Sequence, residues 1–197
     1  MPSDLSTEIA AAAARLVVEE GMEYGPAKRR AARDVARRSV RPADLPGNEE
    51  VEDEVRAYLA LFHADTQPAE LAALRRVALE WMTRLSAFRP HLTGAVWRGT
   101  ATRLNSVHLQ LYCDDSKSAE LALIDLGVDY EVGSLPGPRG DPVDVLSVTS
   151  RSPEHDEMVT VHMSVLDHDD LRGALKPDAR GRSQRGDVAA LRGLLEP

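Results

Sequence analysis

The spacing of hydrophobic residues changes about halfway along the chain. Up to about residue 90 they recur with the 3.6-residue period of helices, and beyond it they alternate with the period of two that is typical of strands. We therefore predict an α+β protein in which N-terminal helices are followed by a small mixed β-sheet.

The first half of the sequence predicts four helices with recognisable ends. Glycine is favoured just after a helix and proline in its first turn. Asn, Ser and Thr favour the N-cap. The expected helices run from about Asp4 to a stop at Gly21, from Gly25-Pro26 to about Arg38, from a cap at Asn48 through Phe62, and from Thr66 or Gln67 to a point before Pro90.

The second half predicts strands with one helix among them and one at the end. We expect the strand around Val107 to pair with the strand around Val159, because both have one apolar and one polar face. The expected strands are Gly94 to Arg98, Val107 to Tyr112, Tyr130 to Val132, Val143 to Thr149 and Val159 to Val165, and the expected helices are Ser116 to Leu126 and the one capped by Asp187.

Proline and glycine between Val40 and Gly47 mark the clearest linker in the chain. We place a boundary there and divide the sequence into three segments. Residues 1–45 form an N-terminal helical pair with a basic second helix, 46–175 form the α/β core, and 176–197 form a C-terminal loop and short helix.

Charge and cysteine content narrow the class of protein. The 197 residues include 24 basic and 32 acidic side chains, a net charge of −8, which argues against a protein that coats nucleic acid over its whole surface. Cys113 is the only cysteine, so one chain can form neither a disulfide nor a thiolate zinc site. The sequence shows no basic leader and no apolar run of about 20 residues. We expect a cytoplasmic protein with no membrane partner.

The most specific local pattern is the segment Trp97-Arg98-Gly99-Thr100 followed, after a polar loop, by the strand that begins near Asn105. It resembles the signature of the nucleotidyltransferase-fold superfamily. There a Gly-Ser or Gly-Gly turn precedes a strand that carries Asp-x-Asp, and a later strand carries a third carboxylate. The resemblance covers roughly Pro68 to Leu166 and implies a sheet of nucleotidyltransferase-like type.

Carried over residue by residue, the resemblance implies a site that has lost its metal ligands. Gly99 and Thr100 match the turn, whereas Ser106 and His108 stand where the two aspartates are expected. Thr160 stands at the third carboxylate position, for which Asp144 is the other candidate. A serine and a neutral imidazole cannot replace two carboxylates around Mg²⁺. The resemblance therefore implies a degenerate, non-catalytic member without a cofactor, and Mg²⁺ is expected only if the protein is an active transferase.

Three functions remain open at this stage: two concern this segment, and the third is a nucleic-acid binder that acts through arginines of the second predicted helix. The first is a binding or regulatory module in which Arg98 and Arg103, beside the Gly99 turn, hold a nucleotide or phosphate without metal. The second is an enzyme, either a residual transferase that uses Asp144 or a different chemistry around His108 and His162. In the simplest alternative the segment has no ancestral site, and Asn105-Ser106 is an ordinary turn before a strand.

His108 and His162 are also candidate metal ligands, because both lie on the polar sides of predicted strands. With Asp144 they could complete a three-ligand site, whereas the alternative is a pair of hydrogen-bonded strand histidines. The acidic run from Asp167 to Asp170 could attract a cation or form the first turn of a short helix.

The second predicted helix carries an arginine stripe that could follow nucleic-acid phosphates. Seven basic residues lie between Lys28 and Arg41, against one acid. The alternative is a solvated face, or one paired with the acidic cluster that follows Gly47. The stripe consists of Arg29, Arg30, Arg33, Arg37 and Arg41. As a further possibility, the N-terminal helices could bind a protein partner.

Overall fold

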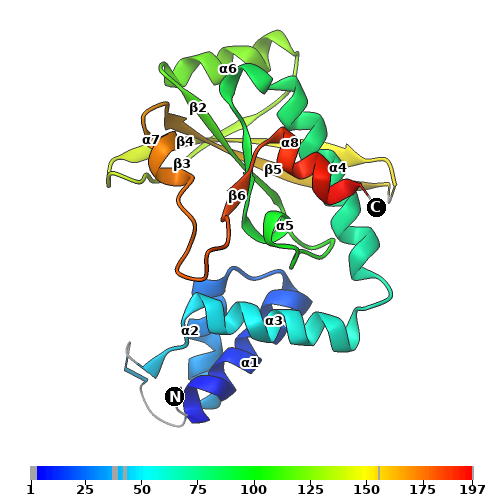
Figure 1. The fold of residues 1–197 in the computed structure, drawn as a ribbon, viewed down its shortest axis with the longest axis vertical. Coiled ribbons are helices and arrows are strands. Elements are labelled where there is room, and N and C mark those ends of the chain that lie inside the picture. Colours follow the sequence, from blue (N-terminus) through cyan, green and yellow to red (C-terminus); the bar gives the residue numbers. More distant parts are fainter. Residues whose placement is uncertain (1–3, 37–39, 42–43, 155, 197) are drawn as a thin grey trace. The chain divides into compact units, whose positions relative to one another are not determined.

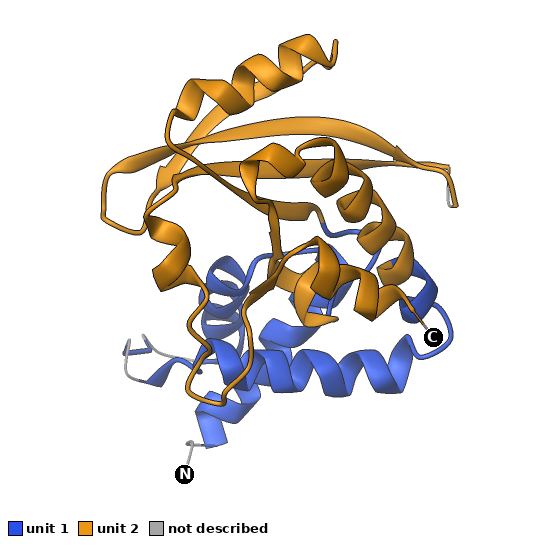
Figure 2. Cartoon of the chain, turned by 45° about the horizontal axis from the view of Figure 1, so that its top comes forward, with its two compact units in different colours: residues 1–70, 100–105 blue, residues 71–99, 106–197 orange. Residues whose placement is uncertain are grey.

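A computed structural model describes residues 4–36, 40–41, 44–154 and 156–196 of the chain. The chain divides into two compact units (Figure 2). The first contains residues 1–70 and 100–105, and the second contains residues 71–99 and 106–197.

The described residues of the first unit contain three complete helices: α1 (Asp4–Glu20), α2 (Tyr24–Val35) and α3 (Asn48–Phe62). The buried face of α1 packs against both other helices, through a core of small and branched apolar side chains such as Ile9, Ala31 and Val55. The predicted helices are confirmed, but α3 lies with the N-terminal pair rather than with the α/β core that begins at residue 46 in the sequence-based division. Its apolar stripe is covered by α1, and the linker between Val40 and Gly47 does not separate the two units.

Helix ends in this unit follow the predicted residues closely, with two differences. Gly21 ends α1 with a φ of +66°, as expected for a glycine stop. The N-cap of α3 is Gly47 rather than Asn48, because the carboxylate of Glu50 accepts the Gly47 N–H at 2.7 Å. Helix α2 ends at Val35, before the predicted end at Arg38, which lies outside the described residues.

The second unit is built on a six-stranded mixed sheet with strand order β3-β4-β5-β2-β1-β6 (Figure 1). Strands β2 and β5 are parallel neighbours, which confirms the predicted pairing, and the other neighbouring strands are antiparallel. The α+β class is thereby established. The strands are β1 (His91–Thr93), β2 (Val107–Cys113), β3 (Glu131–Pro136), β4 (Pro142–Ser152), β5 (Glu157–Asp167) and β6 (Arg185–Gly186).

Along the chain, helices come before, between and after the strands of the sheet. Helix α4 begins in the first unit and continues in the second, and α6 packs on β2 and β5. None of the helices in the described ranges combines the length and apolar composition that a membrane crossing requires. The helices are α4 (Gln67–Arg84), the 3₁₀ turn η2 (Ser86–Phe88), α5 (Gly94–Arg98), α6 (Ser116–Asp125), α7 (Asp170–Ala174) and α8 (Val188–Leu195).

The strand predicted at Gly94 to Arg98 is wrong, because this segment is helix α5 and the strand is the preceding β1. Gly94 and Gly99 have φ values of +75° and +83°, so the backbone turns at both ends of a short apolar run. Such a run does not distinguish strand from helix by its period. The predictions for the other end of the chain are confirmed: the acidic run leads into α7, and the Asp187 side chain caps α8 by accepting the Ala190 N–H at 2.9 Å.

The two faces of the sheet differ in polarity. On β2 and β5, alternate residues such as Val107, Leu109, Val161 and Met163 are fully buried. The residues between them are polar and only partly covered. This second face, called the polar face below, carries the candidate site.

Candidate functional site

The strand register places one polar residue from every strand in a single line across the polar face. Residues that are opposite one another on neighbouring strands point to the same side of a sheet. We call this line the polar row. In sheet order it consists of Glu131 on β3, Ser147 on β4, His162 on β5, His108 on β2, Thr93 on β1 and Arg185 on β6.

The centre of the polar row is a pair of histidines joined to a serine. The rings of His108 and His162 lie 5.1 Å apart, tilted by 30°, and Ser147 Oγ is 2.8 Å from Nδ1 of His162. The expected approach of the two histidines is therefore confirmed. The hydrogen bond with Ser147 matches the alternative of hydrogen-bonded strand histidines, since it occupies one of the two nitrogens through which His162 could bind a metal.

The three-ligand site with Asp144 is wrong. Asp144 lies three residues before Ser147 on β4, so the two side chains point to opposite faces of the sheet. The pKa of Lys117 on α6 is raised mainly by its hydrogen bond to Glu120. The negative charge of Asp144 raises the same pKa more weakly, which is the interaction that Asp144 makes on its own face. Throughout the described part of the chain, no three His, Cys, Asp or Glu side chains are placed to hold a metal ion.

Ser106 and Thr160 lie on the polar face with the two histidines. Ser106 comes directly before β2, and Thr160 is opposite Thr149 of β4. The structure thus brings Ser106, His108, Thr160 and His162 to neighbouring positions on two parallel strands, and leaves Asp144 on the other face. The polar face offers hydroxyl and imidazole groups at the positions where the family resemblance expects carboxylates.

A cavity of about 510 Å³ lies beside the polar row. Two members of the row, Glu131 and Ser147, line it. Tyr130 at its wall donates a hydrogen bond to Glu120, which raises the pKa of the Tyr130 hydroxyl. The polar lining residues are Asp129, Tyr130, Glu131, Ser147, Thr149 and Thr160.

The other end of the polar row is fixed by hydrogen bonds around Arg185. Its Nη1 donates to Gln110 Oε1 at 2.6 Å, and the Tyr112 hydroxyl donates to the same oxygen at 3.0 Å. The ring of His91 meets Tyr112 edge-on at 5.6 Å. Burial raises the pKa of Tyr112, against the opposing effect of Arg185. Arg185 is therefore held by its neighbours and has little freedom to reach a ligand.

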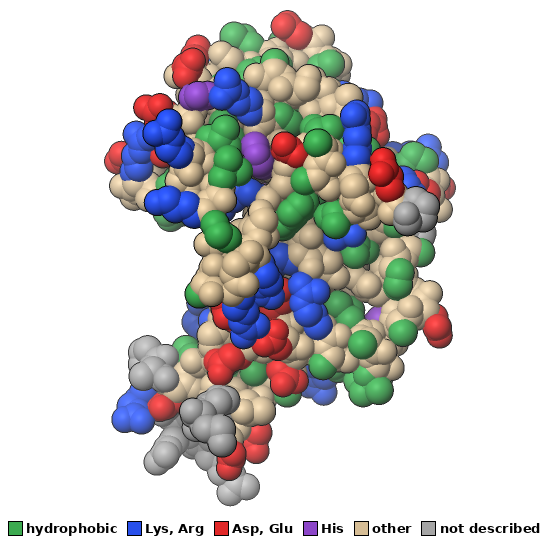
Figure 3. Space-filling view, in the orientation of Figure 1, with side chains coloured by type: hydrophobic (Ala, Val, Ile, Leu, Met, Phe, Trp, Pro, Cys, Tyr) green, Lys and Arg blue, Asp and Glu red, His purple; other side chains and the backbone are tan. Residues whose placement is uncertain are grey.

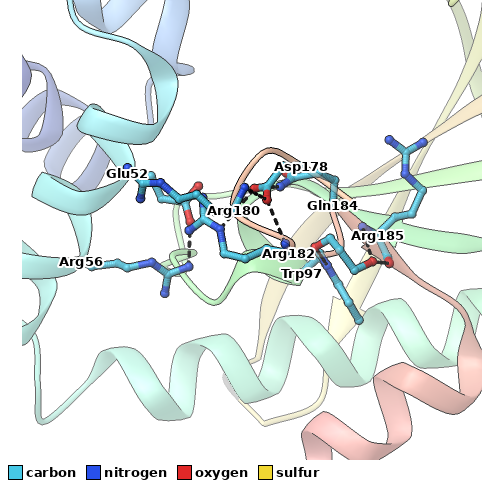
Figure 4. A network of polar contacts seen from close by, with 9 residues as sticks. Glu52, Arg56, Trp97, Asp178, Arg180, Arg182, Gln184 and Arg185 are labelled. Carbon is cyan, nitrogen blue, oxygen red and sulfur yellow. Dashed lines mark hydrogen bonds and ion pairs between the residues drawn. The ribbon is translucent and has the colours of Figure 1, made fainter. Parts of the chain in front are cut away.

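The loop before β6 keeps Arg185 in this place (Figure 4). The carboxylate of Asp178 accepts hydrogen bonds from the Arg182 backbone at 2.8 Å and from the Gln184 amide at 2.7 Å. Thr93 Oγ1 donates to the Gln184 carbonyl at 3.1 Å, which joins the loop to β1. The two-residue strand β6 is thus held by the hydrogen bonds of its loop as well as by its backbone pairing with β1.

The Gly99 turn does not have the geometry of a phosphate site. It follows the carboxyl end of α5, with the Gly99 N–H bonded to the Ala95 carbonyl at 2.9 Å, whereas phosphates bind at helix N-termini. Arg75 already donates to the carbonyls of Val96 and Trp97 at 3.2 and 3.3 Å, and its burial lowers its pKa.

The neighbours of this turn belong to different units. Arg98 and Gly99 are in the second unit, whereas Thr100 and Arg103 are in the first. Thr100 is buried, and the Arg103 backbone N–H donates to the Glu70 carboxylate at 2.9 Å. The geometry of the turn therefore gives no support to a phosphate held by Arg98 and Arg103.

The arginine stripe is shorter than the sequence suggests. Arg29, Arg30 and Arg33 lie on α2, but Arg41 lies beyond the helix and pairs with Asp44 at 2.8 Å. Arg30 pairs with Glu20 at 2.5 Å. Arg37 lies outside the described residues. Because α2 ends at Val35, a five-residue helical stripe does not form, and nucleic-acid binding stays a prediction without support from helix geometry.

Sequence reasoning missed four members of the polar row: Thr93, Glu131, Ser147 and Arg185. Ser147 could have been found, because it lies between the buried residues Leu146 and Val148 in a predicted strand. The others depend on the pairing register, which no local pattern contains.

No family model, curated protein or solved structure matches the chain. Its function must therefore be argued from the polar face itself. Hydroxyls and imidazoles can donate and accept hydrogen bonds to a ligand, but they do not form the carboxylate set that a pair of Mg²⁺ ions needs.

Proposed function

We propose that this chain is a non-catalytic binding module with a degenerate nucleotidyltransferase-like core, and that its polar face binds a nucleoside. The observation that carries the proposal is the polar row with its Ser147–His162 hydrogen bond, next to a cavity of about 510 Å³. Cavities of roughly 300–1,000 Å³ are the usual size for small-molecule sites.

The charges that line the cavity favour the sugar and base of a nucleotide over its phosphates. Asp129 and Glu131 carry negative charge at the cavity wall and repel phosphate. The same carboxylates accept hydrogen bonds from ribose hydroxyls and amino groups. The hydroxyls of Ser147, Thr149 and Thr160 supply further donors and acceptors for a base edge.

The absence of catalysis follows from the residues at the metal positions. Ser106, His108 and Thr160 offer no carboxylate, and Asp144 points to the opposite face. Nucleotidyl transfer depends on metal ions that align the phosphates. We expect no transfer by the purified protein with Mg²⁺ or Mn²⁺. Transfer by the unmodified protein that Asp144→Asn abolishes would show instead that it is an enzyme.

A nucleoside titration followed by NMR or calorimetry tests the binding proposal. Adenosine and cytidine should bind saturably and shift the NMR signals of the polar row, and inorganic phosphate should leave those signals unchanged. Ser147→Ala and Thr160→Val should each weaken nucleoside binding about two- to tenfold, the effect of one lost hydrogen bond. Thr83→Val is a matched control, because Thr83 is exposed on α4, donates to the Leu79 carbonyl of its own helix and does not line the cavity.

Two results would refute the proposal. One is the absence of saturable nucleoside binding up to about 10 mM, well above the Kd of a weak site. The other is nucleoside binding that the Ser147 and Thr160 variants leave as strong as in the Thr83 control. Either result would show that the polar face is not a nucleoside-binding surface.

A further inference from the structure

Two adjoining cavities of about 610 and 550 Å³ lie at the carboxyl end of the parallel strands β2 and β5. They share Arg89 and Leu171. Arg89 comes just before β1, which runs antiparallel to β2, and His168 directly follows β5. Ligands of α/β proteins bind where parallel strands end. We call this pair of cavities the strand-end cavity.

Cationic side chains dominate the polar part of the strand-end cavity. Arg89, Arg172 and Arg192 line it, against the carboxylates of Asp169 and Asp187. Asp187 is occupied as the cap of α8. Neither Arg172 nor Arg192 forms an ion pair with another described residue. Figure 3 shows several Lys and Arg side chains over α7, with Asp and Glu side chains beside them.

The contact between Arg89 and His168 presents further donors. A guanidinium can only donate, so His168 Nε2 accepts from Arg89 Nη1 in this contact, and the other N–H groups of the guanidinium are the donors that remain. The backbone of Arg89 has a φ of +47°, which is rare for a residue other than glycine. Its carbonyl accepts the Nδ1 proton of His91 at 2.8 Å, which helps to hold this conformation. Residues in sparsely populated conformations cluster at ligand sites.

Apart from Ser86 and His91, the rest of the lining is apolar. Leu171 and Leu175 line the first cavity, and Leu175 is 52% exposed although it is a large hydrophobic residue. Pro90, Val188 and Ala189 line the second. The strand-end cavity thus combines guanidinium groups, which match oxyanions in geometry, with surface that gains from apolar contact.

We propose that the strand-end cavity binds a small molecule that carries a phosphate monoester on an apolar body. The arginines bind the phosphate through charge-assisted hydrogen bonds, and the leucines contact the apolar part. This site shares no lining residue with the cavity beside the polar row. It therefore does not depend on the proposed nucleoside site.

Phenyl phosphate is the probe, added to the full chain and followed by two-dimensional NMR. It should bind saturably and more tightly than inorganic phosphate, and benzyl alcohol, which lacks the charge, should not bind. Arg89→Gln and Arg172→Gln should each weaken phenyl phosphate binding about tenfold. Arg76→Gln is the matched control, since Arg76 is an exposed arginine of α4 that pairs with Glu154 and lines neither cavity.

Three outcomes would overturn this proposal. The first is no saturable binding of phenyl phosphate up to about 10 mM. The second is binding by the two cavity variants that is as tight as in the Arg76 control. The third is inorganic phosphate binding as tightly as phenyl phosphate, which would exclude the apolar contact. Nucleoside binding should persist in Arg89→Gln, because Arg89 does not line the cavity beside the polar row. If phenyl phosphate does not bind but nucleosides still do, the phosphate proposal fails and the proposed function stands.

Discussion

Gly186→Ala tests the contact that holds the shortest strand of the sheet. Gly186 lies in β6 opposite Leu92 of β1, and a methyl group at this position would lie 2.1, 2.2 and 2.9 Å from three ring carbons of Trp97. The indole cannot move freely, because its Nε1 donates to the Ser183 carbonyl at 2.8 Å. The substitution must therefore displace either the ring or the strand.

The expected loss of stability comes from two parts. Overpacking of this kind costs about 1–3 kcal/mol, and loss of the Trp97–Ser183 hydrogen bond adds about 1 kcal/mol. The free energy of unfolding should fall by about 2–4 kcal/mol. For a chain of this length each kcal/mol corresponds to roughly 2–4 °C, so the melting temperature should fall by roughly 4–16 °C.

Urea and thermal unfolding followed by circular dichroism measure this effect. Gly193→Ala is the matched control, because nothing lies within 4 Å of the added methyl group and the residue is in helix α8. It should stabilise the protein by about 0.5–1 kcal/mol. In a Trp97→Leu background, Gly186→Ala should become nearly neutral. An equal cost in both backgrounds would refute the role of the ring.

Three further changes test other parts of the second unit. Ser147→Ala should lower the free energy of unfolding by about 1 kcal/mol through loss of the bond to His162, measured by urea unfolding. Arg75→Met keeps the aliphatic stem but leaves two carbonyls at the end of α5 without their donor, and should cost about 2 kcal/mol in the same assay. Asp178→Asn tests pH dependence, because hydrogen bonds from the backbone and side chain of Arg182 lower the pKa of Asp178. Its stabilisation is complete above the unfolded pKa of about 3.9 and is lost as pH falls through the lower folded value, so the wild type and the variant should converge only below about pH 4.

The elements that could be predicted from sequence are those whose local pattern agrees with their final packing. The helix stop at Gly21 and the cap at Asp187 depend on residues within one or two turns, and both were predicted correctly. Strands β2 and β5 were found because buried and polar residues alternate along most of each strand.

The parts that could not be predicted depend on contacts far apart in the sequence. The segment Gly94–Arg98 is a helix because glycines turn the backbone at both of its ends, and its few apolar residues fit either period. Helix α3 could not be assigned to its unit from sequence. Its apolar residues show that one face is buried, but they do not identify the helix that covers this face. The face on which Asp144 lies follows from the register of β4, which is fixed only when the whole sheet is paired.

The strand order also has a consequence for how the protein folds. Strands β3, β4 and β5 follow one another along the chain and pair as a local meander, whereas β6 pairs with β1 from almost the opposite end of the second unit. Pairings between distant segments carry a larger loop-closure entropy and form late. The polar row takes one residue from each of the six strands, so it is complete only when the last of these pairings has formed. In contrast, the cavity beside the row takes its lining from β3, β4, β5 and the residues just before β3, so a ligand bound there would stabilise the local meander and would leave the opening of the β1–β6 edge unchanged.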